Sequence, residues 1–494
     1  MDTVYIIAID QSTQGTKAML IDNEGHVAAS EVVPHRQIVN DKGWVEHDGE
    51  EIISNLFMAV RLLVENNQIA KSRIVGVGIA NQRETVAVWD RITGKPIYNA
   101  IVWQCNRAAD ICNRIEREGR AEYISKTTGL RLSPFFSGPK IAWILENVPG
   151  ALERANKGEL CCGTMDSWVI YNLTGGKHHK TDCSNASRMQ LLNLKKIQWD
   201  EKTCDIFHIP MNCLPEICDS DALFGETDFN GLFDRPLPIH AAIGDSHAAL
   251  FAHGCFESGM CMTGYGTGSC VMMNLGDRPI LSKKGVLTSI AWKTNGEVRY
   301  AFDGVINYSG AVISWLINDL KLIFAPNETD ALSKEANPAD TTYLVPAFTG
   351  IGAPHWSNEA KAVFCGMSRT TGKAELVRAA LESIALQIAD VVNAMKDDAN
   401  TEISVMRVGG GPTKNDYLMQ FQSDILECPL QKPYNEEMTC LGAAYIAGLA
   451  LGVYDRQSLN DHLQYKEYLP RMSEQIRNKK LAGWDQAIKL SLGH

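Results

Sequence analysis

One arrangement of strands and turns occurs twice in this chain, once in each half. In the first half, the apolar runs 4–9 and 17–21 flank a short polar turn, and the run 27–33 adds a third strand. In the second half, the runs 261–265 and 270–274 flank a turn of small residues. Apolar runs of this length that are bounded by turn residues predict antiparallel β-strands. Because the same order appears twice, we infer an internal duplication in which each half is an α/β unit.

The length of the chain indicates that these two units are separate domains. Single hydrophobic cores stop growing at about 250–300 residues, and this chain has 494. We place the boundary near residue 250, which gives the domains 1–250 and 251–494. The predicted fold class is α/β, with a cleft between the domains where ligands would bind. Helices are expected at residues 50–64, 108–117, 374–399, 417–426 and 441–450.

Charge and cysteine content argue against several classes of function. The net charge is −11, without long runs of one sign, which disfavours binding to nucleic acid. The 14 cysteines form no C-x-x-C pair, so we expect buried free thiols in a reducing compartment rather than zinc ligands. The first residues lack the basic region of a signal peptide, and the longest apolar stretch, 443–454, is too short to span a bilayer. A cytoplasmic protein without membrane contact is therefore expected.

Two turns have the residues of a phosphate-binding site, and a third turn is rich in glycine. Hydroxyls and amide N–H groups in the turn 11–16 can bind phosphate oxygens, and Asp10 before it can hold a magnesium ion through water. The turn 266–269 has the same character, and the glycines 409–411 would let a ligand approach the backbone closely. None of them is a Walker A loop or a G-x-G-x-x-G sequence. An ordinary β-hairpin with a polar turn is the alternative for the turn 11–16.

Asp245 is the candidate general base. It follows the apolar run 239–243 and precedes a helix start, and a carboxylate at such a junction can accept a proton from a hydroxyl group. Aspartate at this position can equally serve as a helix cap, and the spacing does not separate the two roles. His247 is interpreted as a helix residue rather than a second base.

Recognition of a polyol needs paired polar groups for adjacent hydroxyls and an apolar wall for the carbon chain. Arg83 and Glu84 follow a predicted strand and offer a donor and an acceptor side by side. Trp103 follows another apolar run and offers a flat wall. The alternative for Arg83 and Glu84 is an exposed ion pair, which would contribute little.

Several motifs, in order along almost the whole chain, resemble those of the glycerol kinases within the FGGY carbohydrate kinase family. Both signatures of that family are also recognisable, at residues 135–147 and 362–382. The resemblance implies an actin-like ATPase fold of two ribonuclease H-like domains, with ATP and polyol meeting in the cleft. The motifs are NQRET at 81–85, NAIVWQC at 99–105, WVEHD at 44–48, NASR at 185–188, YGTG at 265–268, PAFTG at 346–350 and LMQFQSD at 418–424.

The resemblance also implies residue roles. It makes Asp245 the base that deprotonates the attacking primary hydroxyl, and it assigns Asp10 to Mg²⁺. Arg83, Glu84 and Trp103 fall in the implied polyol site. The implied nucleotide contacts are Thr13, Gln14, Gly15, Lys17, Gly266, Thr267, Gly310, Ser314, Gly411 and Asn415.

The chain departs from the pattern of glycerol kinases at three positions of the implied polyol site. Those enzymes typically have tyrosine at the position of Phe135, glutamine at that of Ser246 and phenylalanine at that of Cys270. The changes enlarge the pocket or make it less polar, and a lost hydroxyl partner weakens selectivity. The hypothesis that follows is a substrate of four or five carbons, such as erythritol, xylulose or ribulose, instead of glycerol. Side chains also differ from the typical ones at Gln14, Gly15, Lys17 and Ser314.

Further expectations concern regulation and the rival functions. The segment 230–236 is apolar with one glycine, unlike the loop that binds fructose 1,6-bisphosphate in some bacterial glycerol kinases, so no inhibition by that sugar is expected. The alternative from another class is a non-catalytic sensor of nucleotide and sugar, against which the retained Asp10 and Asp245 argue. The quaternary state is left open, with a homodimer or a homotetramer compatible with these predictions.

Overall fold

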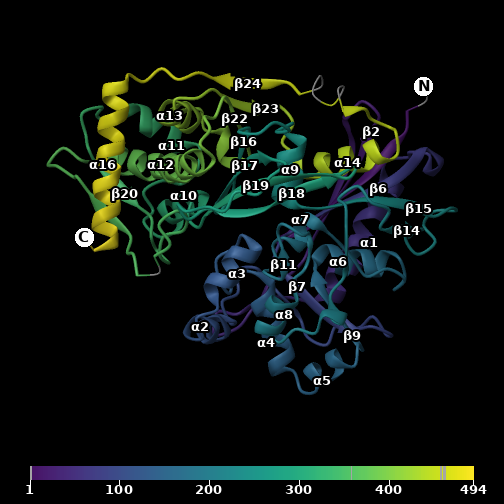
Figure 1. Ribbon diagram of the computed structural model, residues 1–494. Helices are drawn as coiled ribbons and strands as arrows, with labels where there is room; N and C mark the ends of the chain where they lie inside the picture. Colours follow the sequence, from purple (N-terminus) through teal and green to yellow (C-terminus); the bar gives the residue numbers. More distant parts are fainter. Residues whose placement is uncertain (1–2, 358, 457–458, 460–462, 494) are drawn as a thin grey trace.

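The computed structural model describes residues 3–357, 359–456, 459 and 463–493. Two large sheets lie in its upper part, and a separate lobe extends below them (Figure 1). The first sheet has the order β14-β15-β6-β1-β2-β3, in which β1, β2 and β3 are antiparallel and β1, β6 and β15 are parallel. Its strands are β1 (Tyr5–Gln11), β2 (Gly15–Asp22), β3 (Val27–Pro34), β6 (Ile74–Asn81), β14 (Gly225–Thr227) and β15 (Leu237–Gly244).

The second sheet repeats the design of the first. Its order is β18-β19-β17-β16-β22-β23-β24, in which β19, β17 and β16 are antiparallel and β16, β22 and β23 are parallel. The series β3-β2-β1-β6-β15 and β19-β17-β16-β22-β23 therefore match in order and direction, which confirms the predicted duplication. The strands are β16 (Cys261–Tyr265), β17 (Ser269–Gly276), β18 (Leu287–Thr294), β19 (Glu297–Ile306), β22 (Met406–Gly409), β23 (Leu430–Pro433) and β24 (Tyr465–Tyr468).

The lower lobe is built from residues of the first half and was not predicted. It holds an antiparallel sheet in the order β4-β5-β8-β7-β9, formed by strands of two to five residues. Three two-stranded sheets complete the β-structure, β10 with β13, β11 with β12 and β20 with β21. The bounds are β4 (Ile38–Val39), β5 (Val45–His47), β7 (Val86–Asp90), β8 (Ala100–Ile101), β9 (Leu160–Thr164), β10 (Lys180–Asp182), β11 (Leu192–Asn193), β12 (Gln198–Trp199), β13 (Glu216–Cys218), β20 (Tyr343–Val345) and β21 (Val363–Cys365).

The predicted helices are present with small shifts at their ends. The helix that starts beside Asp48, for example, begins there because the Asp48 carboxylate accepts hydrogen bonds from the N–H groups of Glu50 and Glu51. The α-helices are α1 (Gly49–Asn66), α2 (Ala109–Arg117), α3 (Ala121–Thr128), α4 (Ser137–Asn147), α5 (Ala151–Asn156), α6 (Met165–Leu173), α7 (Cys183–Ala186), α8 (Glu201–Ile206), α9 (Asp245–Ala252), α10 (Gly310–Asn318), α11 (Glu328–Glu335), α12 (Lys373–Ala399), α13 (Asp416–Leu426), α14 (Met438–Ala450) and α16 (Glu474–Leu492).

Helices α9 and α14 pack against each other and join the two halves of the molecule. α14 comes from the second half, yet it packs on β1, β6 and β15 of the first sheet. One hydrophobic cluster contains buried residues of both sheets and of both helices. A Cβ atom at Gly442 would lie 2.0 Å from the carbonyl oxygen of Ala248. Glycine is therefore required where the two helices approach each other.

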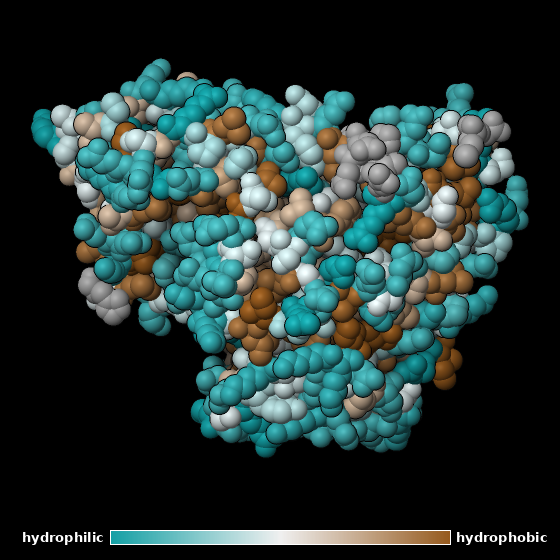
Figure 2. Space-filling model, turned by 45° about the horizontal axis from the view of Figure 1, so that its top comes forward, coloured by the Kyte–Doolittle hydropathy of each residue, from teal (hydrophilic) through white to brown (hydrophobic). Residues whose placement is uncertain are grey.

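The outer surface of the protein is mostly polar, and its cysteines are unpaired. Figure 2 shows hydrophilic residues over the lower lobe and around the rim, with hydrophobic residues gathered toward the middle of the face. All 14 cysteines are free, and most of them are buried. Among the described residues, no helix combines the length and the apolar character needed to cross a membrane.

Candidate active site

The segment 82–85 follows the carboxyl end of β6 and organises the site. Gln82 fixes it to the first turn, because its N–H donates to the carbonyl of Gln11 at 2.7 Å. Glu84 has a φ of 61°, a left-handed conformation that is uncommon for a residue other than glycine. Such conformations persist where the surrounding structure imposes them, and they concentrate at functional sites. The local backbone thus turns Arg83 and Glu84 toward different partners.

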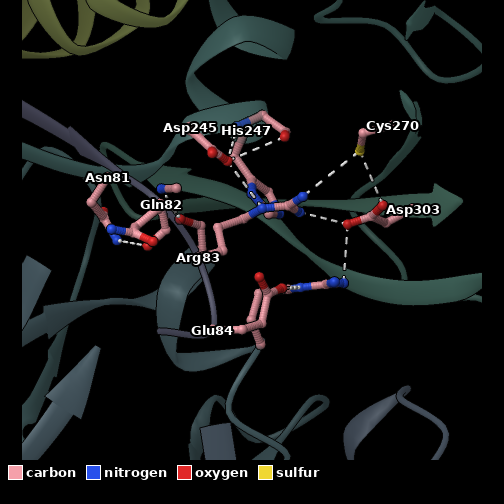
Figure 3. A network of polar contacts seen from close by, with 12 residues as sticks. Asn81, Gln82, Arg83, Glu84, Asp245, His247, Cys270 and Asp303 are labelled. Atoms are coloured by element: carbon pink, nitrogen blue, oxygen red, sulfur yellow. Dashed lines mark hydrogen bonds and ion pairs between the residues drawn. The ribbon is translucent and has the colours of Figure 1, made fainter. Parts of the chain in front are cut away.

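Arg83 is buried and lies between two carboxylates. Its side chain is 8% exposed, its Nε lies 3.1 Å from Oδ1 of Asp245, and its Nη1 lies 2.6 Å from Oδ2 of Asp303. Figure 3 shows the guanidinium group between these partners. Glu84, itself 2% exposed, pairs with Arg188 at 2.5 Å instead of with Arg83. The interpretation of Arg83 and Glu84 as an exposed ion pair is therefore wrong.

Asp245 is the first residue of α9, at the carboxyl end of β15. The N-cap position of α9 is taken by Gly244 and not by Asp245. Its Oδ1 accepts hydrogen bonds from the N–H of Ser246 at 2.6 Å and from the Ser246 hydroxyl at 3.2 Å. Its side chain is 37% exposed, which leaves it accessible to a ligand. His247 is buried in the same helix, where burial and then Arg83 hold its pKa well below the ordinary value.

Asp303 on β19 brings the second sheet into this network. It is fully buried and lies 3.0 Å from Nη1 of Arg188, in addition to its contact with Arg83. The thiol of Cys270 donates to its Oδ1 at 3.2 Å, and Arg83 Nη2 donates to the same sulfur at 3.7 Å. Although burial opposes ionisation, the two guanidinium groups hold the pKa of Asp303 well below its ordinary value.

Asp10 faces the same region from the end of β1. Burial and the Asp245 carboxylate raise its pKa to about 7, while Lys17 acts in the opposite direction. Its Oδ1 is buried without a hydrogen-bond partner, and such an oxygen needs a cation or an ordered water. Magnesium in kinases is held by one or two carboxylates together with substrate phosphates. The unpartnered oxygen therefore fits the Mg²⁺ ion that the resemblance implies.

The aromatic residues and the first turn meet beside the segment 82–85. Trp103 Nε1 donates to the hydroxyl of Thr13 at 2.9 Å, and the Trp103 N–H donates to the hydroxyl of Thr85 at 3.1 Å. The ring of Phe135 lies edge-on to that of Trp103, with centroids 5.8 Å apart. A predicted nucleotide contact, Thr13, is thus in direct contact with a predicted wall of the polyol site.

The glycine-rich turns of the second half also come together. The N–H of Gly310 donates to the carbonyl of Gly266 at 2.9 Å, and the N–H of Ser309 donates to that of Thr267 at 3.0 Å. Gly410 has a φ of 98°, and a Cβ atom there would lie 2.0 Å from the carbonyl oxygen of Tyr265. These close backbone approaches bring the turns after β16 and β22 together beside the start of α10.

The remaining predicted nucleotide contacts lie in different surroundings. Asn415 caps α13 by accepting from the N–H of Leu418, and its amide donates to the hydroxyl of Thr329. Lys17, opposite Asp10 in the β1–β2 register, pairs with Glu437 before α14 at 2.6 Å. In the described part of the chain, no hydrogen bond or ion pair joins Asp245 to Gly15, Gly411 or the exposed Gln14 and Ser314.

Both halves of the chain match one protein family. Residues 5–252 match the N-terminal domain of the FGGY family of carbohydrate kinases, and residues 261–451 match its C-terminal domain. The chain belongs to the FGGY family of carbohydrate kinases. Glycerol kinases from Natranaerobius thermophilus and Alkaliphilus oremlandii are 43% and 44% identical to it over 490 residues. The alignments cover 99% of this chain and 98% and 97% of those relatives.

Solved structures agree with this assignment to the FGGY kinases. The crystal structure of Plasmodium falciparum glycerol kinase with ADP matches with a TM-score of 0.93 at 35% identity, covering 99% of this chain and 98% of that one. A ligand-bound xylulose kinase from Lactobacillus acidophilus matches with a TM-score of 0.88 at 22% identity, covering 98% and 97%, which shows the common fold. The predicted α/β fold of two ribonuclease H-like units is confirmed.

Sequence reasoning missed three charged residues near the predicted site of this FGGY kinase. Arg188 was noted only as part of a motif, and Asp303 and Glu437 were not considered. Asp303 had a signal that could have revealed it, since it is a carboxylate within the mostly apolar run 300–306 of β19, where burial without a partner would be costly. Glu437 had no such signal, because its partner Lys17 lies 420 residues away in the sequence.

Proposed function

We propose that this FGGY kinase transfers the γ-phosphoryl group of ATP to a primary hydroxyl of glycerol or of a closely related small polyol. The observation that carries the proposal is the position of Asp245, paired with Arg83 and electrostatically coupled to the unpartnered Asp10. The names of the full-length relatives support glycerol as the acceptor, and the ADP in the Plasmodium falciparum structure supports the nucleotide. The free thiols favour a cytoplasmic location.

In this proposal the chain supplies a base and a set of positioning groups. Arg83 and Glu84 hold adjacent hydroxyls of the acceptor, and Trp103 with Phe135 covers its carbon chain. The carboxylate of Asp245 accepts the proton of the attacking hydroxyl. Mg²⁺, held by Asp10, would neutralise charge on the phosphates of the nucleotide. Closure of the two halves would exclude water from the transfer.

A longer acceptor is the second candidate, because three side chains of the proposed polyol site differ from those typical of glycerol kinases. Phe135 has no hydroxyl, and Ser246 and Cys270 are small. The Cys270 thiol donates to Asp303, and it occupies less space than a phenylalanine side chain would. These features favour an acceptor of four or five carbons, such as erythritol, xylulose or ribulose.

One kinetic experiment tests both candidates and the sensor alternative. ADP release is measured for the wild-type protein and for Asp245→Asn with glycerol, erythritol, threitol, xylulose and ribulose. We expect the wild type to turn over glycerol or one of the longer acceptors, and the variant to lose about 10²- to 10⁴-fold in kcat. Nucleotide binding, followed by calorimetry, should be retained in the variant.

The outcomes of this experiment are distinct. A clear preference for glycerol refutes the longer acceptor, and a preference for a longer acceptor refutes glycerol. Unchanged turnover in Asp245→Asn removes Asp245 from the mechanism. If the wild type binds nucleotide but consumes none with any acceptor offered, the sensor replaces the kinase.

A further inference from the structure

An alternating chain of charges crosses from the first half of the molecule to the second. Glu84 pairs with Arg188, Arg188 with Asp303, Asp303 with Arg83, and Arg83 with Asp245. Asp303 is the one member that comes from the second sheet, on β19. Figure 3 shows the Asp303 carboxylate facing the guanidinium group of Arg83. The chain of charges therefore depends on Asp303 for its continuity.

Burial makes this continuity energetically important. The side chains of Asp303 and Arg188 are 0% exposed, and that of Arg83 is 8% exposed. Removing one partner of a buried ion pair leaves an uncompensated charge, which costs far more than an exposed pair contributes. Asp303 balances two guanidinium groups at once, so both would lose a partner if its charge were removed.

Asp303 also determines how Arg83 meets Asp245. Nη1 of Arg83 is held by Asp303 at 2.6 Å, and Nη2 is directed to Cys270, so only Nε reaches Asp245. A guanidinium group that is free to turn favours a bidentate pair with a carboxylate. Without Asp303, Arg83 could turn two of its N–H groups toward Asp245. It would then cover the carboxylate oxygens that should accept a proton.

We propose that Asp303 is a positioning residue for phosphoryl transfer, which holds the guanidinium group of Arg83 across the interface between the two halves and keeps the carboxylate of Asp245 open. The inference rests on the proposed kinase function. It extends that function, because it gives the second sheet a part in orienting the acceptor. The link forms only when β19 lies against the segment 82–85, so Arg83 is correctly oriented only with the two halves together.

The test compares two substitutions of Asp303 that differ in charge and in size. Asp303→Asn keeps the size of the side chain and removes its charge, whereas Asp303→Glu keeps the charge and adds a methylene group. We expect Asp303→Asn to lower kcat/KM for the preferred acceptor by about 100-fold, as misplaced active-site groups do. The KM for ATP should change less than threefold. The kcat/KM of Asp303→Glu for the same acceptor should be at least tenfold higher than that of Asp303→Asn.

A role of Asp303 in packing alone gives the opposite order. In a fully buried site the larger glutamate would disturb packing more than the isosteric asparagine, so Asp303→Glu would then be at least as impaired as Asp303→Asn. That order, or an equal loss for acceptor and ATP, would overturn the proposal. Thermal unfolding of both variants shows whether they are folded.

A matched control is available in the same half of the chain. The side chain of Asp340 is 1% exposed, and its Oδ1 lies 3.7 Å from Nη2 of Arg378, whose side chain is 7% exposed. Asp340→Asn therefore also removes a buried charge beside arginine, and its kinetic constants should stay within threefold of wild type. A 100-fold loss in this control would contradict the specific role of Asp303. The proposed function is judged separately, because it fails only if the wild-type protein phosphorylates none of the acceptors.

Discussion

Asp10 has two properties that lower the stability of the folded protein although they suit a metal-binding role. Its Oδ1 is buried without a partner, and its pKa is raised to about 7. Between about pH 4 and pH 7 the folded protein therefore holds a proton at this site that the unfolded chain has released. Stability should then fall as pH rises through this window, since the unfolded state binds fewer protons. A bound cation would remove this penalty.

Asp10→Asn should accordingly increase stability while it abolishes turnover. At pH 8 in EDTA we expect the variant to gain about 1–3 kcal/mol in free energy of unfolding, because the ionised carboxylate is absent. At pH 4 the gain should vanish. Urea unfolding at both pH values measures the difference, with the exposed Asp41 changed to asparagine as a control. A variant that is less stable than wild type at pH 8 would contradict this account of Asp10.

The positions of Asp10, Asp245 and Arg83 could be predicted because each lies within four residues of the end of an apolar run. Their partners could not be predicted in this way. Arg83 and Asp303 are 220 residues apart in the sequence, and no local pattern connects them. The resemblance to glycerol kinases supplied residue roles, but it did not reveal which charges pair across the interface. Pairing of this kind depends on the tertiary arrangement of two sheets.

At the level of the elements, helices α9 and α14 approach each other closely enough for their backbones to meet. Gly442 on α14 meets the backbone of Ala248 on α9, and Gly78 on β6 meets the backbone of Ala443 from the other side of α14. Backbone atoms cannot move aside as a flexible side chain can. Helix α14 is therefore held closely between the first sheet and the helix that carries Asp245.

Gly442→Ala tests this close contact between α9 and α14. Its Cβ atom would lie 2.0 Å from the Ala248 oxygen, so the two helices must move apart, and overpacking of this kind costs about 1–3 kcal/mol. We expect a loss of that size in free energy of unfolding, together with a lower kcat, because α9 carries the proposed base. Thr439→Ala, in the same helix and only partly buried, should change stability by less than about 0.5 kcal/mol. If Gly442→Ala changed the free energy of unfolding as little as Thr439→Ala does, the two helices would not be closely packed at this point.

Elements with strong periodicity were predicted well, and short ones were missed. Strands β1, β2, β3 and β16 and the long helix α12 agree with their predicted ranges to within about three residues. The lower lobe escaped prediction because its sheet uses strands as short as two residues. Such strands carry too few alternations to give a pattern, and tertiary contacts determine them.

At the scale of the whole molecule, the two halves of the sequence are not two independent bodies. The cluster that joins them contains buried residues such as Ile6 and Ile243 from the first half and Ile446 from α14. A salt bridge between Lys17 and Glu437 also connects these two regions. The boundary near residue 250 stays a prediction, and α14 completes a hydrophobic core of the first half.

This arrangement predicts that the first half does not fold alone. A fragment of residues 1–256 would expose the face of β1, β6 and β15 on which α14 packs, and apolar surface of that extent favours aggregation or loose structure. We expect the fragment to bind a hydrophobic dye and to lack a cooperative thermal transition. Attaching residues 434–456 through a flexible linker should restore the transition, whereas a linker carrying α16 instead should not. A cooperative transition of the unaided fragment near that of the full chain would show that α14 is dispensable for the first half, and the two halves would then be independent folding units.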